Sequence, residues 1–377
     1  MKKQVGIMLI LYFFMLSGQP LTANNATINE PLQKIAVILD SPEFYHSSYT
    51  DDVLRGFKYI NQTYQIDFDV FQLENYTRNK IAPYEVTYTY NGSSTNHTHL
   101  TETLIQTNQY DLFVLVGYEL RREFNVSAYS ETNFLFYDLA GAFPTFTGTS
   151  IPDNLFVVSF QENETAFIAG SLTVAEFYPL PPKIGIVGSW KGDARTRQLI
   201  AGFQSAIFRN TTDIDISISY IDTYIDQEKV QTIGSEFSNQ NIELVFTALQ
   251  ANNTLTMLNS VTSGDVVCVD LNQSMSVMKN NTRVLTEIFK SFNDTQGFFG
   301  GIAASFGISD NIFYANGWSD PSVVNKTMVE LYEEVIAGDL IIPTDVKYAS
   351  NTPNISLLMV ILVILPILSK RRRRSIR

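Results

Sequence analysis

Short runs of continuous apolar residues alternate along this chain with segments whose apolar residues recur at helical spacing. Val53, Phe57 and Ile60 show that helical spacing in one such segment. The strand-like segments, most of them apolar and rich in β-branched residues, lie at 34–40, 68–73, 111–117, 134–138, 155–159, 183–188, 214–220, 244–247 and 266–270. Strands that are apolar along their whole length are buried on both faces, as in a parallel sheet covered by helices. The alternation therefore predicts an α/β fold.

Two series of these units, of about 130 residues each, are long enough to form two domains. We therefore expect two doubly wound parallel-sheet lobes. In such sheets a ligand binds outside the carboxyl ends of the strands. That position is held by Asp40, Gly117, Asp138, Gly188 and Asp270. A single Asp at a strand end is commonly a cap or loop residue, but three of them predict a shared cleft.

The N-terminal residues have the order of a signal peptide. Lys2 and Lys3 precede an apolar stretch at 7–16, and a stretch of polar and small residues follows. We predict a signal peptide at 1–24, with cleavage near Ala23. A retained N-terminal anchor is the alternative, although the apolar stretch is short for a membrane-spanning helix.

The C-terminal residues predict a membrane anchor. Residues 355–368 are almost entirely apolar, and a cluster of basic residues begins at Lys370. We expect a transmembrane helix at 355–369 and a basic cytoplasmic tail at 370–377, because basic residues stay on the cytoplasmic side. The binding lobes would then be extracellular, held to the cell membrane by a single-pass anchor. A sorting signal that is removed later is the competing interpretation.

The net charge excludes one class of partner. The chain has 26 Lys and Arg residues against 38 Asp and Glu residues, a formal charge of −12. Eight of the basic residues lie in the two terminal segments, so the part between them is more acidic still. An acidic surface repels nucleic acid, and we expect no nucleic-acid partner.

Asn-x-Ser/Thr triplets are frequent, which suits a glycosylated surface protein. They begin at Asn25, Asn61, Asn75, Asn91, Asn96, Asn125, Asn163, Asn210, Asn252, Asn272, Asn280, Asn293, Asn325 and Asn354. An Asn-rich composition alone would produce some of these triplets, so occupancy at each is a prediction.

The sequence carries no recognisable catalytic or metal-binding pattern. Of the three histidines, His97 and His99 lie in a polar segment, and zinc-ligand spacing, a phosphate-binding glycine loop and a nucleophile elbow are all missing. Cys268 is the single cysteine, which excludes an intramolecular disulfide. We therefore expect a binding protein without metal or cofactor rather than an enzyme.

Several blocks of residues occur in the order found in one known family. They are Ser48-Tyr49-Thr50 with Gly56, Tyr110-Asp111 with Gly117, 134–138, 159–164, Ala201-Gly202-Phe203, 269–273 and 284–290. On these blocks the chain resembles the basic membrane protein, or purine nucleoside receptor, type of substrate-binding protein for ABC transporters. The resemblance extends from Lys34 to Pro343.

The resemblance implies a type I periplasmic-binding-protein fold that closes over a nucleoside. Lobe I would comprise 33–158 and about 275–312, and lobe II 159–274 and about 313–348. The nucleobase would lie between two aromatic rings, at positions held here by Tyr49 and Tyr224, and such stacking contributes about 1–3 kcal/mol per base. The other implied ligand contacts are Asp40, Thr50, Asp138 and the ribose-binding pair Asp270 and Lys290.

The chain departs from the family pattern at Thr50, where the family has Asn, and at 247–254, which replaces a glycine-rich ligand loop. We predict an extracytoplasmic protein that captures a nucleoside, with a purine base expected, and delivers it to the permease of an ABC importer. A membrane-tethered sensor of the same fold with a different small-molecule ligand is the alternative. A nucleoside hydrolase that uses Asp40 or Asp138 as its base is a third possibility.

Overall fold

The computed structural model describes residues 31–39, 48–73, 77–80, 86–90, 93–117, 124–138, 151–211, 213–223, 226–249, 251–262, 264–272 and 274–344. The expected signal peptide at 1–24 and the expected anchor and tail at 355–377 lie outside the described residues. Asp40 and Tyr224 lie outside them as well. Within the described part of the chain, none of the helices combines the length and the apolarity needed to cross a bilayer.

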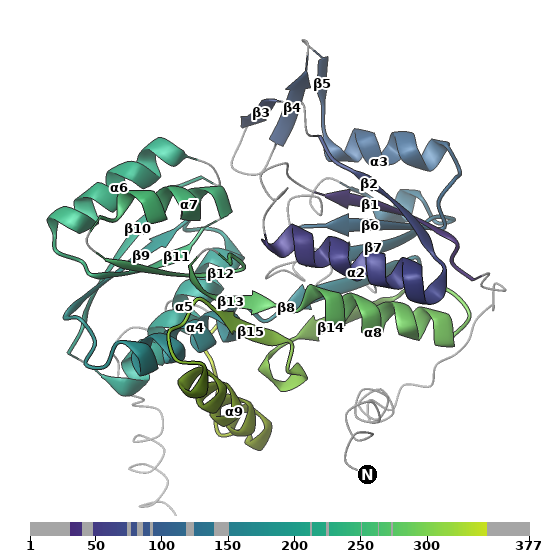
Figure 1. Ribbon diagram of the computed structural model, residues 1–377. Helices are drawn as coiled ribbons and strands as arrows, with labels where there is room; N and C mark the ends of the chain where they lie inside the picture. The colour runs from purple at the N-terminus through teal and green to yellow at the C-terminus, as the bar shows by residue number, and fades with distance from the viewer. Residues whose placement is uncertain are drawn as a thin grey trace, which may run out of the picture.

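The first lobe is built on a parallel six-stranded sheet in the order β14-β8-β7-β6-β1-β2 (Figure 1). Its strands are β1 (Lys34–Leu39), β2 (Asp67–Phe71), β6 (Leu112–Val116), β7 (Asn133–Tyr137), β8 (Leu155–Phe160) and β14 (Ile302–Phe306). Helices α2 (Ser48–Tyr64) and α8 (Asn281–Asp294) pack on one face, and α3 (His97–Gln106) covers the other. Alternate residues of β1 from Ile35 to Leu39 divide between the two faces, which explains why the strand is apolar after Lys34.

The second lobe contains a six-stranded sheet in the order β10-β9-β11-β12-β13-β15. Its strands are β9 (Lys183–Gly188), β10 (Asp215–Tyr220), β11 (Leu244–Ala248), β12 (Asp265–Val269), β13 (Met275–Lys279) and β15 (Phe313–Asn316), of which β15 alone runs antiparallel to its neighbour. Helices α4 (Glu162–Glu176) and α5 (Ala194–Asn210) cover one face, and α6 (Gln227–Asn239) and α7 (Ala251–Ser260) cover the other. The last helix of the described residues, α9 (Pro321–Ala337), packs against α4 below the sheet (Figure 1).

A small antiparallel sheet extends from the first lobe between β2 and α3 (Figure 1). It consists of β3 (Thr77–Lys80), β4 (Val86–Tyr90) and β5 (Ser93–Thr95). This sheet leaves no apolar pattern in the sequence, because its strands are mostly polar and lack the continuous apolar runs of the main sheets.

Within the described residues the chain passes between the two lobes three times. It leaves the first sheet after Phe160, returns after Lys279, and crosses once more between β14 and β15. Backbone hydrogen bonds join these crossings: Gln161 N donates to Phe306 O at 2.8 Å, and Asn280 N donates to Ile312 O at 2.8 Å. The three segments therefore form one connected hinge region.

The expected fold of two parallel-sheet lobes is confirmed, but one expected boundary is not where the strands place it. The chain was expected to return to the first lobe at about 275, whereas β13 belongs to the second sheet and the return follows Lys279. Parallel neighbours are normally separated by a crossover of a dozen or more residues. Only 270–274 separate β12 from β13, so the alternation of strands and helices did not reveal this strand.

Candidate ligand-binding site

Two aspartates occupy equivalent places in the two lobes. Asp138 directly follows β7 and Asp270 directly follows β12. Each of these strands is the fourth of its sheet when the first sheet is read from β2 and the second from β10. Both residues have left-handed backbone, with φ of 63° and 57°. Residues other than glycine seldom adopt this conformation, and it is concentrated at functional sites. The backbone therefore turns at both strand ends in a way that directs the two carboxylates to one place.

Lys279, the last residue of β13, connects these carboxylates. Its side chain is 0% exposed, and its Nζ lies 3.3 Å from Asp138, 3.1 Å from Asp270 Oδ2 and 2.6 Å from Glu162 Oε1. An isolated buried ammonium would be very costly, so these contacts keep it charged. Burial by itself lowers the pKa of Lys279, but the three carboxylates raise it above the usual value.

Arg195, the second residue of α5, closes a ring of alternating charges. Its Nε lies 3.3 Å from Glu162 Oε1, and its Nη2 lies 3.3 Å from Asp270 Oδ2. Each of these two carboxylates is therefore shared between Arg195 and Lys279, and we call the four residues the charge ring.

The two carboxyls of the charge ring respond differently to burial. Burial raises the pKa of Asp270, and Lys279 opposes that rise only in part. Burial also opposes ionisation of Glu162, but Arg195 and Lys279 hold its pKa below the usual value. Glu162 is therefore ionised more readily than Asp270.

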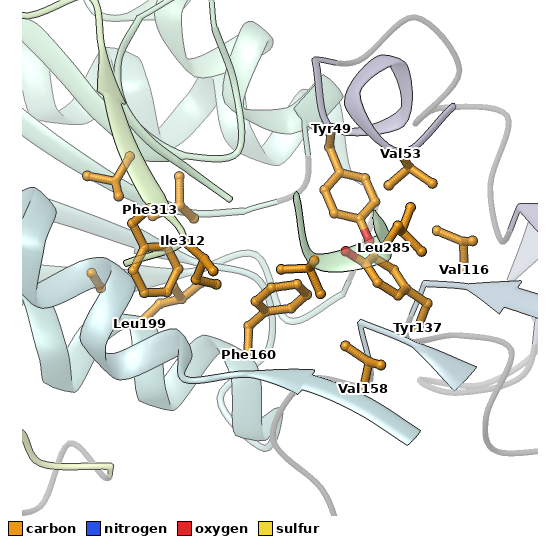
Figure 2. Packing of buried hydrophobic residues seen from close by; sticks show 14 of the residues in the cluster. Tyr49, Val53, Val116, Tyr137, Val158, Phe160, Leu199, Leu285, Ile312 and Phe313 are labelled. Atoms are coloured by element: carbon orange, nitrogen blue, oxygen red, sulfur yellow. The ribbon is translucent and has the colours of Figure 1, made fainter. Parts of the chain in front are cut away.

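Aromatic rings enclose the charge ring on the side of the first lobe. Lys279 Nζ lies 4.8 Å from the ring centroid of Phe160 and 6.0 Å from that of Tyr49. The hydroxyl groups of Tyr49 and Tyr137 point toward the same place (Figure 2), and Tyr137 donates to Asn281 Oδ1 at 3.0 Å. Burial, with the charge of Asp138 adding to it, raises the pKa of both tyrosines well above the usual value. Both therefore stay neutral.

The start of α8 is fixed to α2 beside these rings. The Asp52 carboxylate accepts from Asn281 N at 2.6 Å and from Thr282 Oγ1 at 2.9 Å. It thereby occupies the N-terminal end of α8, where a negative charge is favourable. Asp52 ties the second crossing of the hinge to the helix that carries Tyr49.

The structure brings together some of the predicted contact residues. Asp138 and Asp270 meet on Lys279, and Tyr49 lies beside them, 6% exposed. Thr50 is buried next to Tyr49 in the first turn of α2. Asp40 and Tyr224 are outside the described residues, so their roles stay predictions.

The predicted ribose contacts of Asp270 and Lys290 stay a prediction, but the structure gives Asp270 two other cationic partners. Lys290 lies on α8, and the cations that contact Asp270 are Lys279 and Arg195. Lys279 was not predicted because strand β13 was missed, and without that strand nothing placed the lysine at its carboxyl end beside a strand-terminal Asp. Glu162 and Arg195 were also missed, because each lies in the first turn of a helix that meets the site only in three dimensions.

The polar groups of the site can hold a ligand that carries hydrogen-bonding groups. Carboxylates accept from hydroxyl and N–H groups, and lysine and arginine donate to oxygen or nitrogen. Among the described residues, no group of His, Cys, Asp and Glu has the arrangement of a metal site. The three carboxylates surround an ammonium instead.

Comparison with known proteins agrees with this geometry. A family model described as ABC transporter substrate-binding protein, PnrA-like, matches residues 32–335. The chain belongs to this family. Basic membrane protein A of Borreliella burgdorferi is 21% identical over 336 residues, which cover 86% of this chain and 91% of the relative. Basic membrane protein A of Borreliella afzelii is 22% identical over 327 residues, covering 83% and 92%.

Solved structures show the same fold at low sequence identity. A solute-binding protein of an ABC transporter system from Aeropyrum pernix K1 superimposes with a TM-score of 0.60 at 15% identity, covering 84% of this chain and 95% of that one. One from Conexibacter woesei also gives 0.60, at 10% identity, covering 83% and 99%. The family consists of substrate-binding proteins of ABC transporters, so this chain is a binding protein rather than an enzyme, with a small-molecule ligand and a permease as partner.

Proposed function

We propose that this protein captures a nucleoside, with a purine base preferred, outside the cell and passes it to an ABC importer. The observation that carries the proposal is the meeting of Asp138 and Asp270, one from each lobe, on the buried Lys279. A ligand held by these groups would be held by both lobes at once, which is what closure of a two-lobed binding protein requires. Membership of the PnrA-like family supports the transport role.

The described conformation is one in which the site groups satisfy each other. Asp138 and Asp270 are almost fully buried, and so is the ring of Tyr49. A nucleoside would enter after rotation of the lobes about the hinge, with ribose hydroxyls or base N–H groups bonding to the carboxylates. Tyr49 would then present a ring face to the base, with Tyr224 proposed as the second ring.

Attachment to the cell membrane is part of the proposal and follows from the sequence. A signal peptide at 1–24 would direct the chain to export, and a helix at 355–369 would hold it in the membrane, with the tail at 370–377 in the cytoplasm. Deleting 355–377 should release the protein into the medium, and continued retention on the membrane would contradict the anchor.

Glycosylation is proposed for the exposed triplets only. Asn125, Asn210, Asn293 and Asn325 lie on the surface, which suits modification. Asn163 is buried in α4, and its Nδ2 donates to Ile342 O at 3.0 Å. A glycan there would displace the end of the described chain, so we expect Asn163 to be unmodified. Peptide mass spectrometry of the mature protein tests this distribution directly.

Thermal unfolding with and without nucleosides tests the ligand class. The purified full-length chain in detergent should be stabilised by adenosine, guanosine or inosine, by about 2.7 kcal/mol when the ligand is at one hundred times its Kd. Asp138→Asn should weaken that effect, whereas Asp265→Asn, at the exposed amino end of β12, is the matched control outside the site. Absence of a shift with every nucleoside at millimolar concentration would refute nucleoside binding while leaving the family assignment intact.

Uptake measurements separate transport from sensing. If the protein supplies an importer, deleting it should reduce uptake of radiolabelled nucleoside by the cell, and the Asp138→Asn variant should not restore it. Unchanged uptake combined with confirmed nucleoside binding would favour the sensor alternative.

A further inference from the structure

Arg195 lies where helix stability alone does not favour a cation. It is the second residue of α5, and the N-terminal turn of a helix carries partial positive charge that disfavours a positive side chain. The N-cap of the helix is already provided by Asp193, whose side chain accepts from Thr196 N at 2.8 Å. The two carboxylates that Arg195 contacts, Glu162 and Asp270, account for its position.

The charge ring and Asp138 together form a cluster that is close to neutral. Three carboxylates face two cations, which gives a formal charge of −1. Within the described residues, Glu162 Oε2 is buried without a hydrogen-bond partner. Removing Arg195 would leave three carboxylates around a single ammonium.

The members of the cluster differ in their access to solvent. The side chains of Lys279 and Glu162 are 0% exposed, whereas those of Arg195, Asp138 and Asp270 are 13%, 11% and 10% exposed. The cluster has two cations, and Arg195 is the one that is exposed, so a ligand beside the two aspartates can reach it. Its guanidinium is always charged, so its contribution does not depend on pH.

We propose that Arg195 sets the ligand charge that this site accepts. By holding the cluster near neutrality it lets the site bind an uncharged ligand that offers hydrogen-bond donors to Asp138 and Asp270. The remaining negative charge excludes anionic forms of that ligand, such as a phosphate ester. Without Arg195 the cluster would carry a charge of −2 and would favour a cationic ligand. This inference rests on the proposed function and identifies the residue that determines its charge selectivity.

A series of probes that differ only at the 5′ position, and there in charge, tests the proposal. Adenosine is neutral, 5′-amino-5′-deoxyadenosine is cationic, and adenosine 5′-monophosphate is anionic. Isothermal calorimetry on the full-length chain should show the monophosphate binding at least tenfold more weakly than adenosine. In Arg195→Ala the affinity of the amino compound relative to adenosine should rise by tenfold or more. Arg195→Lys keeps the charge and should keep the wild-type ratio.

A matched control removes the same charge from the other end of the same helix. Arg209 lies in the last turn of α5, where it forms a two-bond pair with Glu334 at 2.7 Å. Fourteen residues of helix separate it from Arg195 by about 21 Å, beyond the screening length of about 8–10 Å at physiological salt. Arg209→Ala should therefore leave the ratio unchanged. Thermal unfolding of each variant confirms that it is folded.

The outcomes distinguish this inference from the proposed function. The proposed role of Arg195 is overturned if Arg195→Ala changes the affinity of the amino compound relative to adenosine no more than Arg209→Ala does. It is also overturned if the monophosphate binds as well as adenosine. If adenosine, guanosine and inosine all fail to bind the wild type, nucleoside binding fails, and mass spectrometry of co-purifying small molecules replaces the probe series. Arg195→Ala should then shift those molecules from neutral toward cationic compounds, and an unchanged set overturns the proposal.

Discussion

Replacing Lys279 by methionine should destabilise the protein strongly at neutral pH. The substitution keeps most of the side-chain volume but removes the ammonium that contacts Asp138, Glu162 and Asp270 at 2.6 to 3.3 Å. At an effective dielectric constant of about 20, each such contact corresponds to about 5 kcal/mol of Coulomb attraction. Desolvation offsets most of that sum, and breaking a buried ion pair from one side costs about 3–5 kcal/mol in practice.

The pH dependence of this loss separates an electrostatic cause from a packing defect. Burial already raises the pKa of Asp270, and without Lys279 the carboxyl loses its nearest cation, so its pKa rises further. A carboxyl with a raised pKa in the folded state favours folding when protonated, and that stability is lost as the pH rises through the folded-state pKa. The variant should therefore regain stability as the pH falls from 7 toward about 4, the usual Asp range.

Urea denaturation followed by tryptophan fluorescence measures this effect at several pH values. Lys326→Met is the control, because Lys326 is 76% exposed and pairs with Glu330 at 3.8 Å, a contact worth about 0.3–0.5 kcal/mol. A loss in Lys279→Met as small as that of the control, or a loss that does not shrink in acid, would refute the electrostatic reasoning.

Three further predictions concern the hinge, the lobe packing and the cysteine. Burial raises the pKa of Glu164, whose Oε2 accepts a hydrogen bond from Ile308 N at 2.6 Å. Protonation of Glu164 therefore stabilises the folded state as the pH falls, and Glu164→Gln should remove that part of the stability. Equal pH profiles of the urea midpoint in the variant and the wild type would contradict this. A Cβ at Gly202 would lie 2.0 Å from Asn163 O, and Gly202→Ala should cost about 1–3 kcal/mol or more, measured by thermal unfolding. Burial raises the pKa of Cys268 to about 12, so its thiol should react with a disulfide reagent only on unfolding, and rapid labelling of the native protein would show otherwise.

The main sheets could be predicted from the sequence because strands buried on both faces have continuous runs of apolar residues. The strand 112–116 is apolar throughout, the strand 34–39 is apolar after Lys34, and each ends near a residue suited to a loop. The positions of Asp138 and Asp270 followed from the rule that ligands bind at the carboxyl ends of parallel strands. These inferences need only the pattern of neighbouring residues.

The cations of the site could not be predicted, because their partners are distant in the sequence. Arg195 meets Asp270 across 75 positions, and Lys279 meets Glu162 across 117. A lysine at the end of an unrecognised strand looks like a surface residue, since lysine is rarely buried without partners. The spacing of Lys290 within a family-like block indicates its position in a helix. That spacing does not indicate which residues its side chain faces.

The repeated passage of the chain between lobes determines the order in which the protein can be completed during synthesis. The nascent first domain lacks α8, whose Phe289 lies 5.9 Å from Phe57 of α2, and it lacks the edge strand β14 beside β8. Both are translated only after most of the second domain has left the ribosome. A truncated product that stops before Asn281 would therefore expose aromatic surface on α2 and an unpaired edge of the sheet, and would be a target for chaperones and proteases.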